Sequence, residues 1–229
     1  MDIYRQDGLY SIPIREPIIC GVYLMTIKLY GYGRSRSFRC LWALYEAEIE
    51  HEFVVVDFGS SDTNGTQSPE YLQINPQGKI PSLRHNDFNL TESAAIINYI
   101  DTLSERPFIP TEAQARASYD ELAYFVLAEL EQPLWSNGKH RFAIPEEYRV
   151  PQMLETAKWE FAKAIKALEK LVTIDEFALG NEFSFADILL AQTIDWADRF
   201  NFEVPKKYLS YRNNMFSRPA AKAALSKVK

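Results

Sequence analysis

The sequence predicts a molecule in two parts, a mixed α/β half followed by an all-helical half. Three observations support this order. Residues 27–104 alternate short β-type and helical segments in the order β-α-β, loop, β-β-α. Residues 111–229 carry only helical periodicities. Between them, Pro107 and Pro110 stiffen a short connection. The predicted fold class is therefore α/β plus all-α.

Residues 1–26 precede the first half and have no clear hydrophobic period. Pro13 and Pro17 interrupt the apolar residues and disfavour a regular element there. The pattern starts afresh at Met25, which is a candidate natural initiator. We expect residues 1–26 to be an N-terminal arm outside the core, with an additional strand as the alternative.

The elements of the first half follow from their periods. A short strand around Ile27 and Leu29 should end at Gly31 and Gly33, where glycine permits a sharp loop. Apolar residues at helical spacing over 38–49 predict an amphipathic helix. The other expected elements are a cap from Ser35 or Ser37, a buried strand over 52–57, a loop over 59–69, one helical turn at 71–74, a hairpin over 82–90 and a helix over 94–103.

The second half should begin with a long helix over 111–132, which Pro133 ends or kinks. A loop rich in basic and aromatic residues is expected over 136–150, and another helix over 155–171.

The strongest local signal in this half lies at residues 183–188. Ser184 and Asp187 have the spacing of a capping box, with Phe183 and Ile188 as a hydrophobic staple. The helix that follows is apolar nearly all round, so we expect it at the centre of the half.

Charge and composition exclude several classes of protein. The net charge of −6 disfavours a nucleic-acid partner. The longest apolar stretch, residues 18–25, is much shorter than the roughly 20 residues that span a bilayer. It also makes a poor signal peptide, so a cytoplasmic location is expected. Cys20 and Cys40 do not form a redox pair, Cys40 should be a core residue, and the scattered histidines predict no metal site.

Three motifs together resemble the cytosolic glutathione S-transferase family. They are Gln77-Gly-Lys-Ile-Pro81, Thr91-Glu92-Ser93 and the Ser184-x-x-Asp187 box, and the resemblance covers about residues 27–225. It implies a thioredoxin-like N-terminal domain over 27–104 and a helical C-terminal domain over 111–229. It also implies glutathione as co-substrate, a small electrophile as second substrate, and a homodimer that pairs unlike domains of its two subunits.

The resemblance also implies which residues bind glutathione. Pro81 would be a cis proline, and the backbone of Ile80 would pair with the cysteinyl unit like a strand. Lys79 would lie near the glycyl carboxylate. Glu92 would bind the γ-glutamyl ammonium, and Ser93, at a helix start, the γ-glutamyl carboxylate. The alternatives are a plain helix cap, a solvated turn lysine and an ordinary strand-entry proline.

The catalytic residue is expected in the loop before the first helix. Serine-type members of the family place there a hydroxyl that donates to the glutathione sulfur, and Ser35 is the prediction. Ser37, Tyr32 and Arg34 are the alternatives, since a competing alignment puts Arg34 at the serine position. Tyr119, Tyr124, Trp135 and Phe142 are candidates for the electrophile pocket, with a core role as the alternative.

Three functions fit this pattern. The first is a transferase that conjugates the glutathione thiolate to a small apolar electrophile. The second is a glutathione-dependent disulfide reductase or peroxidase, which the lack of a Cys-x-x-Cys motif disfavours. The third is a non-catalytic binding module, which has no need of the complete motif at 79–81 and 92–93.

Overall fold

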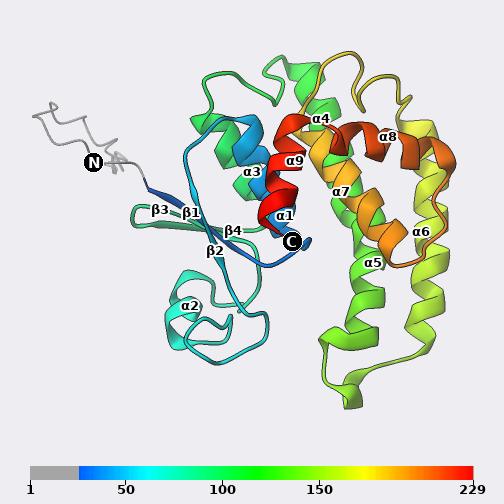
Figure 1. Cartoon of the computed structure of the whole chain (residues 1–229). Coiled ribbons are helices and arrows are strands. Elements are labelled where there is room, and N and C mark those ends of the chain that lie inside the picture. Colours follow the sequence, from blue (N-terminus) through cyan, green and yellow to red (C-terminus); the bar gives the residue numbers. More distant parts are fainter. Residues whose placement is uncertain (1–25, 229) are drawn as a thin grey trace, which may run out of the picture.

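The computed structural model describes residues 26–228, and Figure 1 shows their arrangement. The predictions for the N-terminal arm, Met25 and Cys20 lie outside the described residues. Within them, the predicted order of a mixed half and a helical half is confirmed. No helix of residues 26–228 is long and apolar enough to cross a membrane.

A four-stranded mixed sheet forms the centre of the first half. Its strand order is β2-β1-β3-β4, in which β1 runs parallel to β2 and antiparallel to β3, and β3 and β4 form the predicted hairpin. The strands are β1 (Ile27–Gly31), β2 (Glu52–Val55), β3 (Ser82–His85) and β4 (Phe88–Thr91).

The strand β2 is not buried as predicted. Its ends, Glu52 and Val55, are exposed, because β2 is an edge strand and has a neighbour on one side only. A run of β-branched residues therefore indicated a strand correctly, but it did not reveal the position of that strand in the sheet.

Three helices complete the first half: α1 (Ser37–Glu46), α2 (Pro69–Ile74) and α3 (Ser93–Leu103). The helix α1 packs against β1, α3, α7 and α9, so it is covered on several sides. This explains why Cys40, Ala43 and Leu44 are buried together with the predicted apolar face.

The second half is helical throughout (Figure 1). The helix α9 returns to pack on α1, and Arg218, which precedes it, donates two hydrogen bonds of 2.6 and 2.8 Å to Glu46 of α1. The elements are α4 (Ala113–Phe125), the π-helical turns η1 (Val126–Leu130) and η2 (Lys139–Ala143), α5 (Glu131–Gly138), the 3-10 turn η3 (Glu146–Tyr148), α6 (Gln152–Leu171), α7 (Phe185–Arg199), α8 (Lys206–Phe216) and α9 (Pro219–Lys227).

Pro133 does not end the long helix, and the predicted loop over 136–150 is wrong for residues 136–143. Pro133 is the third residue of α5, directly after the wider π turn η1. Proline is tolerated in a first helical turn, and the widened turn relieves its clash with the preceding backbone. The chain stays helical through η2 and so reaches Ala143.

The helix α7 lies at the centre of the second half, as predicted. Its capping box is present, and the Asp187 carboxylate accepts a hydrogen bond of 2.8 Å from the Ser184 amide. The same buried carboxylate accepts bonds of 2.7 Å from the Ala178 amide and from the Tyr211 hydroxyl. Asp187 therefore anchors the start of α7 to two further segments.

Candidate active site

A pocket of about 660 Å³ lies between the two halves. Elements of both halves form its walls, including the loop before α1, the segment before β3, the start of α3, and the helices α5 and α7. The structure brings all the predicted catalytic and glutathione-binding residues together in this pocket: Ser35, Lys79, Ile80, Pro81, Glu92 and Ser93.

The segment before β3 offers an unpaired stretch of backbone. The Ile80-Pro81 peptide bond is cis. The carbonyl of Lys79 is held from behind by the Tyr71 hydroxyl at 2.7 Å and by the Asn75 amide at 2.8 Å. By contrast, no hydrogen bond within residues 26–228 uses the N–H or C=O of Ile80. That residue can therefore pair with an extended peptide, as an edge strand does.

The start of α3 combines an acid with a helix N-terminus. Glu92 has a φ of 66°, a strained conformation for a residue with a side chain, and its carboxylate lines the pocket 3.4 Å from the Gln77 amide nitrogen. Ser93 is the first residue of α3, and helix N-termini attract anions. The pair thus offers one group for a cation beside one for an anion.

The loop before α1 brings Ser35 to the wall of the pocket. The expected cap from Ser35 or Ser37 is wrong, because Arg36 is the N-cap residue of α1 and no side chain makes a cap hydrogen bond there. Ser37 is the first residue of α1, is wholly buried and does not line the pocket. The Ser35 Oγ lies 2.7 Å from the Ser37 Oγ and accepts a bond of 3.2 Å from the Ser37 amide. Tyr32 and Arg34 also line the pocket, but the Arg34 guanidinium is paired with Asp195.

Aromatic rings of the second half, together with the guanidinium of Arg36, form another part of the pocket wall. Trp135 and Phe142, two of the four predicted candidates, line the pocket. The Cζ of Arg36 lies 5.3 Å from the centroid of the Trp135 ring and 4.9 Å from that of Trp196, which the sequence analysis missed. Phe58, Leu127 and Phe200 were missed as well.

The other two candidates are wrong. Tyr119 is buried in the core, where its hydroxyl donates to Asn98, and Tyr124 is 61% exposed and does not line the pocket. Both lie on α4, before the turn η1, whereas Leu127 and Glu131 bring the long helix to the pocket wall.

Two family models match this chain. One, described as glutathione S-transferase, N-terminal domain, matches residues 25–102, and the other, described as glutathione S-transferase, C-terminal domain, matches residues 132–219. The chain belongs to the glutathione S-transferase family. This is a family of transferase enzymes, and the first half of the present member is its thioredoxin-like domain.

Individual relatives agree with this membership. A zeta-class glutathione S-transferase from Euphorbia esula is 32% identical over 184 residues, 78% of this chain and 79% of that protein. A probable maleylacetoacetate isomerase 1 from Drosophila melanogaster is 26% identical over 201 residues, 86% of this chain and 79% of that protein. The solved structure of a glutathione transferase homologue from Sulfitobacter, with bound glutathione, has the same fold, with a TM-score of 0.76, 23% identity, and coverage of 89% of this chain and 99% of that one.

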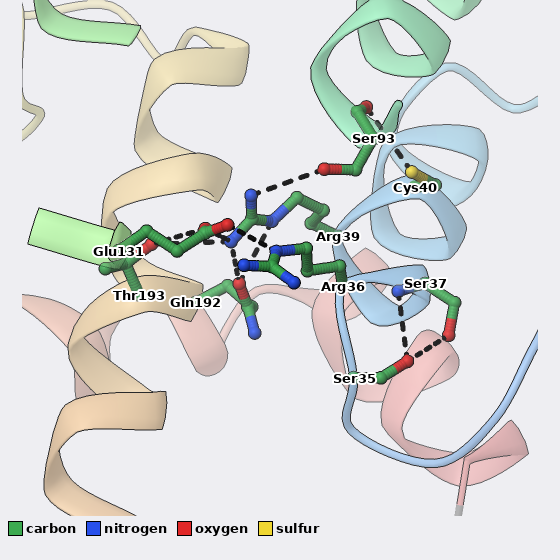
Figure 2. A network of polar contacts seen from close by, with 9 residues as sticks. All are labelled: Ser35, Arg36, Ser37, Arg39, Cys40, Ser93, Glu131, Gln192 and Thr193. Carbon is green, nitrogen blue, oxygen red and sulfur yellow. Dashed lines mark hydrogen bonds and ion pairs between the residues drawn. The ribbon is translucent and has the colours of Figure 1, made fainter. Parts of the chain in front are cut away.

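A buried ion-pair network supports the pocket of this transferase (Figure 2). The guanidinium of Arg39 is wholly buried and bonds the carboxylate of Glu131 and the amide oxygen of Gln192. Arg36 bonds the second oxygen of the same carboxylate. Burial alone would raise the pKa of Glu131, but the two guanidiniums outweigh it and hold that pKa below its usual value.

This network was not predicted from the sequence, although the sequence carries one signal for it. Arg39 stands between Phe38 and Cys40 in a helix whose residues from Ser37 to Leu44 are all buried, and an arginine in such a place needs a buried acid. Its partner Glu131 lies 92 residues away in the other half, so no local pattern identifies it.

Cys40 is the core residue that the sequence predicts. It is wholly buried, and its thiol donates a weak bond of 3.5 Å to the Ser93 carbonyl. Burial raises the pKa of this thiol, so it stays protonated. Among residues 26–228, no group of three or more His, Cys, Asp or Glu side chains is placed to hold a metal ion.

Proposed function

We propose that this transferase binds glutathione and transfers its thiolate sulfur to a small, largely apolar electrophile. One observation carries the proposal: a single pocket combines the free backbone of Ile80, the Glu92-Ser93 pair and the Ser35 hydroxyl. These groups complement the peptide backbone, the charged γ-glutamyl end and the sulfur of glutathione.

Each group has a role that its chemistry supports. The N–H and C=O of Ile80 would pair with the cysteinyl unit. Glu92 would bind the γ-glutamyl ammonium, and the start of α3 at Ser93 would bind the adjacent carboxylate. Lys79, whose exposed ammonium donates to Gln77 at 3.1 Å, would meet the glycyl carboxylate.

Glutathione itself would supply the nucleophile. A free thiol has a pKa of about 8.5 and is mostly protonated at neutral pH. A hydroxyl donor from Ser35 at the start of α1 would favour the thiolate, because both the hydrogen bond and the helix N-terminus stabilise an anion.

The second substrate would lie against the aromatic wall. Trp135, Phe142, Trp196 and Phe200 suit a small planar electrophile, with the guanidinium of Arg36 at its edge. A second candidate is a glutathione-dependent isomerisation, which the zeta-class and isomerase names of the relatives favour. The disulfide reductase has less support, since the one cysteine within residues 26–228 is buried.

Replacing Glu92 by Ala tests the binding site. Loss of a hydrogen bond between a carboxylate and an ammonium costs about 1.5–3 kcal/mol. The dissociation constant for glutathione, measured by calorimetry, should therefore rise roughly tenfold or more. Glu105→Ala, an exposed acid outside the pocket, should leave it unchanged. An unchanged constant for folded Glu92→Ala would make Glu92-Ser93 a plain helix start.

Substrate assays then separate the candidate reactions. Activity on chlorodinitrobenzene indicates conjugation, activity on hydroxyethyl disulfide indicates reduction, and cis-to-trans conversion of an unsaturated acid indicates isomerisation. Failure of the wild type to bind glutathione would leave only the non-catalytic module.

We also propose that the two domains comprise residues 27–104 and 111–229.

We further propose that the protein is a homodimer. Symmetric pairs are the commonest oligomers, and Phe88 of β4 and Tyr124 of α4 expose large apolar surface. Sedimentation equilibrium at micromolar concentration should give twice the chain mass of 26.4 kDa. A mass equal to that of one chain would contradict the proposal. The cytoplasmic location stays a prediction.

A further inference from the structure

We propose that Ser37 is a positioning residue, which fixes the hydroxyl proton of Ser35 toward the glutathione sulfur. The inference rests on the proposed function, since it assumes that Ser35 donates to a bound thiolate. It concerns a residue outside the pocket that touches no substrate.

The direction of the hydrogen bond between Ser35 and Ser37 follows from the neighbouring groups that can act only as donors. The backbone amide of Tyr32 can only donate, and it donates to the Ser37 Oγ at 3.1 Å. The proton of the buried Ser37 hydroxyl then has two acceptors, the Ser35 Oγ at 2.7 Å and the Tyr32 carbonyl at 3.5 Å. Only the first distance is that of a normal O–H···O bond. Ser37 therefore donates to Ser35.

These hydrogen-bond directions leave only the proton of the Ser35 hydroxyl without a partner in the part of the chain that the structure describes. Its oxygen accepts from the Ser37 hydroxyl and from the Ser37 amide at 3.2 Å, and Figure 2 shows both bonds. A hydroxyl has two lone pairs and one proton, so both lone pairs are used. The proton is the remaining group, and no other hydrogen bond of Ser35's side chain is present within residues 26–228. Ser35 lines the pocket, where a thiolate would accept that proton.

The opposite order is worse on every count. If Ser35 donated to Ser37, the Ser37 proton would depend on the 3.5 Å contact with Tyr32, because Ser37 is wholly buried and has no access to water. The Ser35 proton would then bond Ser37 and would not be available to the thiolate. Because successive hydrogen bonds polarise one another, the chain from the Tyr32 amide through Ser37 should strengthen Ser35 as a donor.

Close packing against Gly31 holds Ser37 in this place. A Cβ added to Gly31 would lie 2.3 Å from the Cβ and 2.5 Å from the Oγ of Ser37. Gly31 ends β1, and its backbone, which carries no side chain, approaches the start of α1 so closely that the Ser37 side chain has little room to turn. The Ser37 hydroxyl is thus restricted to the position that meets Ser35.

Ser37→Ala should raise the pKa of the bound glutathione thiol by about half to one unit, since the Ser35 hydroxyl becomes free to rotate. Thiolate absorbance near 240 nm, titrated with the enzyme saturated, measures this pKa. At pH 6.5 the kcat should fall roughly three- to tenfold while the KM for glutathione stays within about twofold. Ser226→Ala, an exposed serine whose hydroxyl donates to a local carbonyl, is the matched control and should change neither.

A double-mutant cycle separates positioning from a general structural effect. In a Ser35→Ala background, Ser37→Ala should change neither the thiol pKa nor kcat further, because Ser37 acts through Ser35. A persisting effect in that background, or equal titration of Ser37→Ala and wild type, would overturn the inference. If Ser37→Ala does not fold, Ser37→Cys replaces the hydroxyl by a thiol, which is a much weaker donor, and should shift the pKa in the same direction. A wild type without a bound thiolate would overturn the proposed function and this inference with it, whereas a thiolate unaffected by Ser37 overturns this inference alone.

Discussion

Replacing Glu131 by Ala should destabilise the protein by about 3–5 kcal/mol, the usual cost of removing one partner of a buried ion pair. The reason is Arg39, which is wholly buried and has Glu131 as its carboxylate partner. Gln192 and Thr193 accept hydrogen bonds from the same guanidinium but carry no charge. Without Glu131, a positive charge would stay in a site from which water is excluded.

Thermal unfolding followed by circular dichroism checks this. The melting temperature should fall by roughly 10 °C, since 1 kcal/mol corresponds to about 2–4 °C in a chain of this size. Glu155→Ala breaks an exposed ion pair with Lys158 and should cost at most about 1 kcal/mol. A fall of only a degree or two in Glu131→Ala would show that Arg39 finds other compensation.

A double replacement identifies the origin of the loss. If the cost is that of an unpaired charge, the double variant Arg39→Met, Glu131→Leu should recover part of the stability, because it removes both charges at similar volume. If the variant stays as unstable as Glu131→Ala, the loss comes from the polar contacts to Gln192 and Thr193 instead.

The network also links folding to function. Arg39 belongs to α1, Glu131 to α5 and Gln192 to α7, so the contacts join both halves (Figure 2). Glu131 and Gln192 also line the pocket. Arg36, one turn before Arg39, uses the same carboxylate and lines the pocket between two tryptophans. Loss of Glu131 would therefore leave Arg36 in the pocket wall without its carboxylate partner, and it would also destabilise the core.

The sequence predicts most of the fold because each element carries its own period. The hairpin over 82–90 and the apolar helix after Ser184 needed no knowledge of their neighbours. The errors arise where the packing of neighbouring elements determines the burial or the course of a segment. The ends of β2 are exposed because it lies at one edge of the sheet, and Pro133 is accommodated because the turn before it widens.

The candidate site divides in the same way. Ile80-Pro81 and Glu92-Ser93 were found because each motif is contiguous, and the loop with Ser35 because it directly precedes a helix. Trp196 and Glu131 were missed as site residues because only the packing of α7 against α1 and the ion pairs of Glu131 with Arg36 and Arg39 bring them to the pocket. A periodicity does show that a residue is buried, but it does not show which partner it meets there.

Ser35→Ala should lower turnover at neutral pH about tenfold or more. A hydrogen bond to a charged group is worth about 1.5–3 kcal/mol, so its loss should raise the pKa of the bound thiol by about one to two units. In the proposed site the charged ends of glutathione would be bound elsewhere, at Lys79, Glu92 and Ser93, so its dissociation constant should change little.

The pH dependence distinguishes this mechanism from a loss of folding. The glutathione thiol bound to Ser35→Ala loses its proton as the pH rises, so raising the pH should restore part of the lost turnover. The pH profile of the rate should follow the thiol titration measured near 240 nm. A misfolded variant would not recover. If Ser35→Ala and wild type titrate alike and turn over alike, Ser35 only supports the start of α1 by accepting from the Ser37 amide. Arg34 would then be the next residue to replace, although its pairing with Asp195 leaves its guanidinium less free to hold a thiolate than an unpaired one.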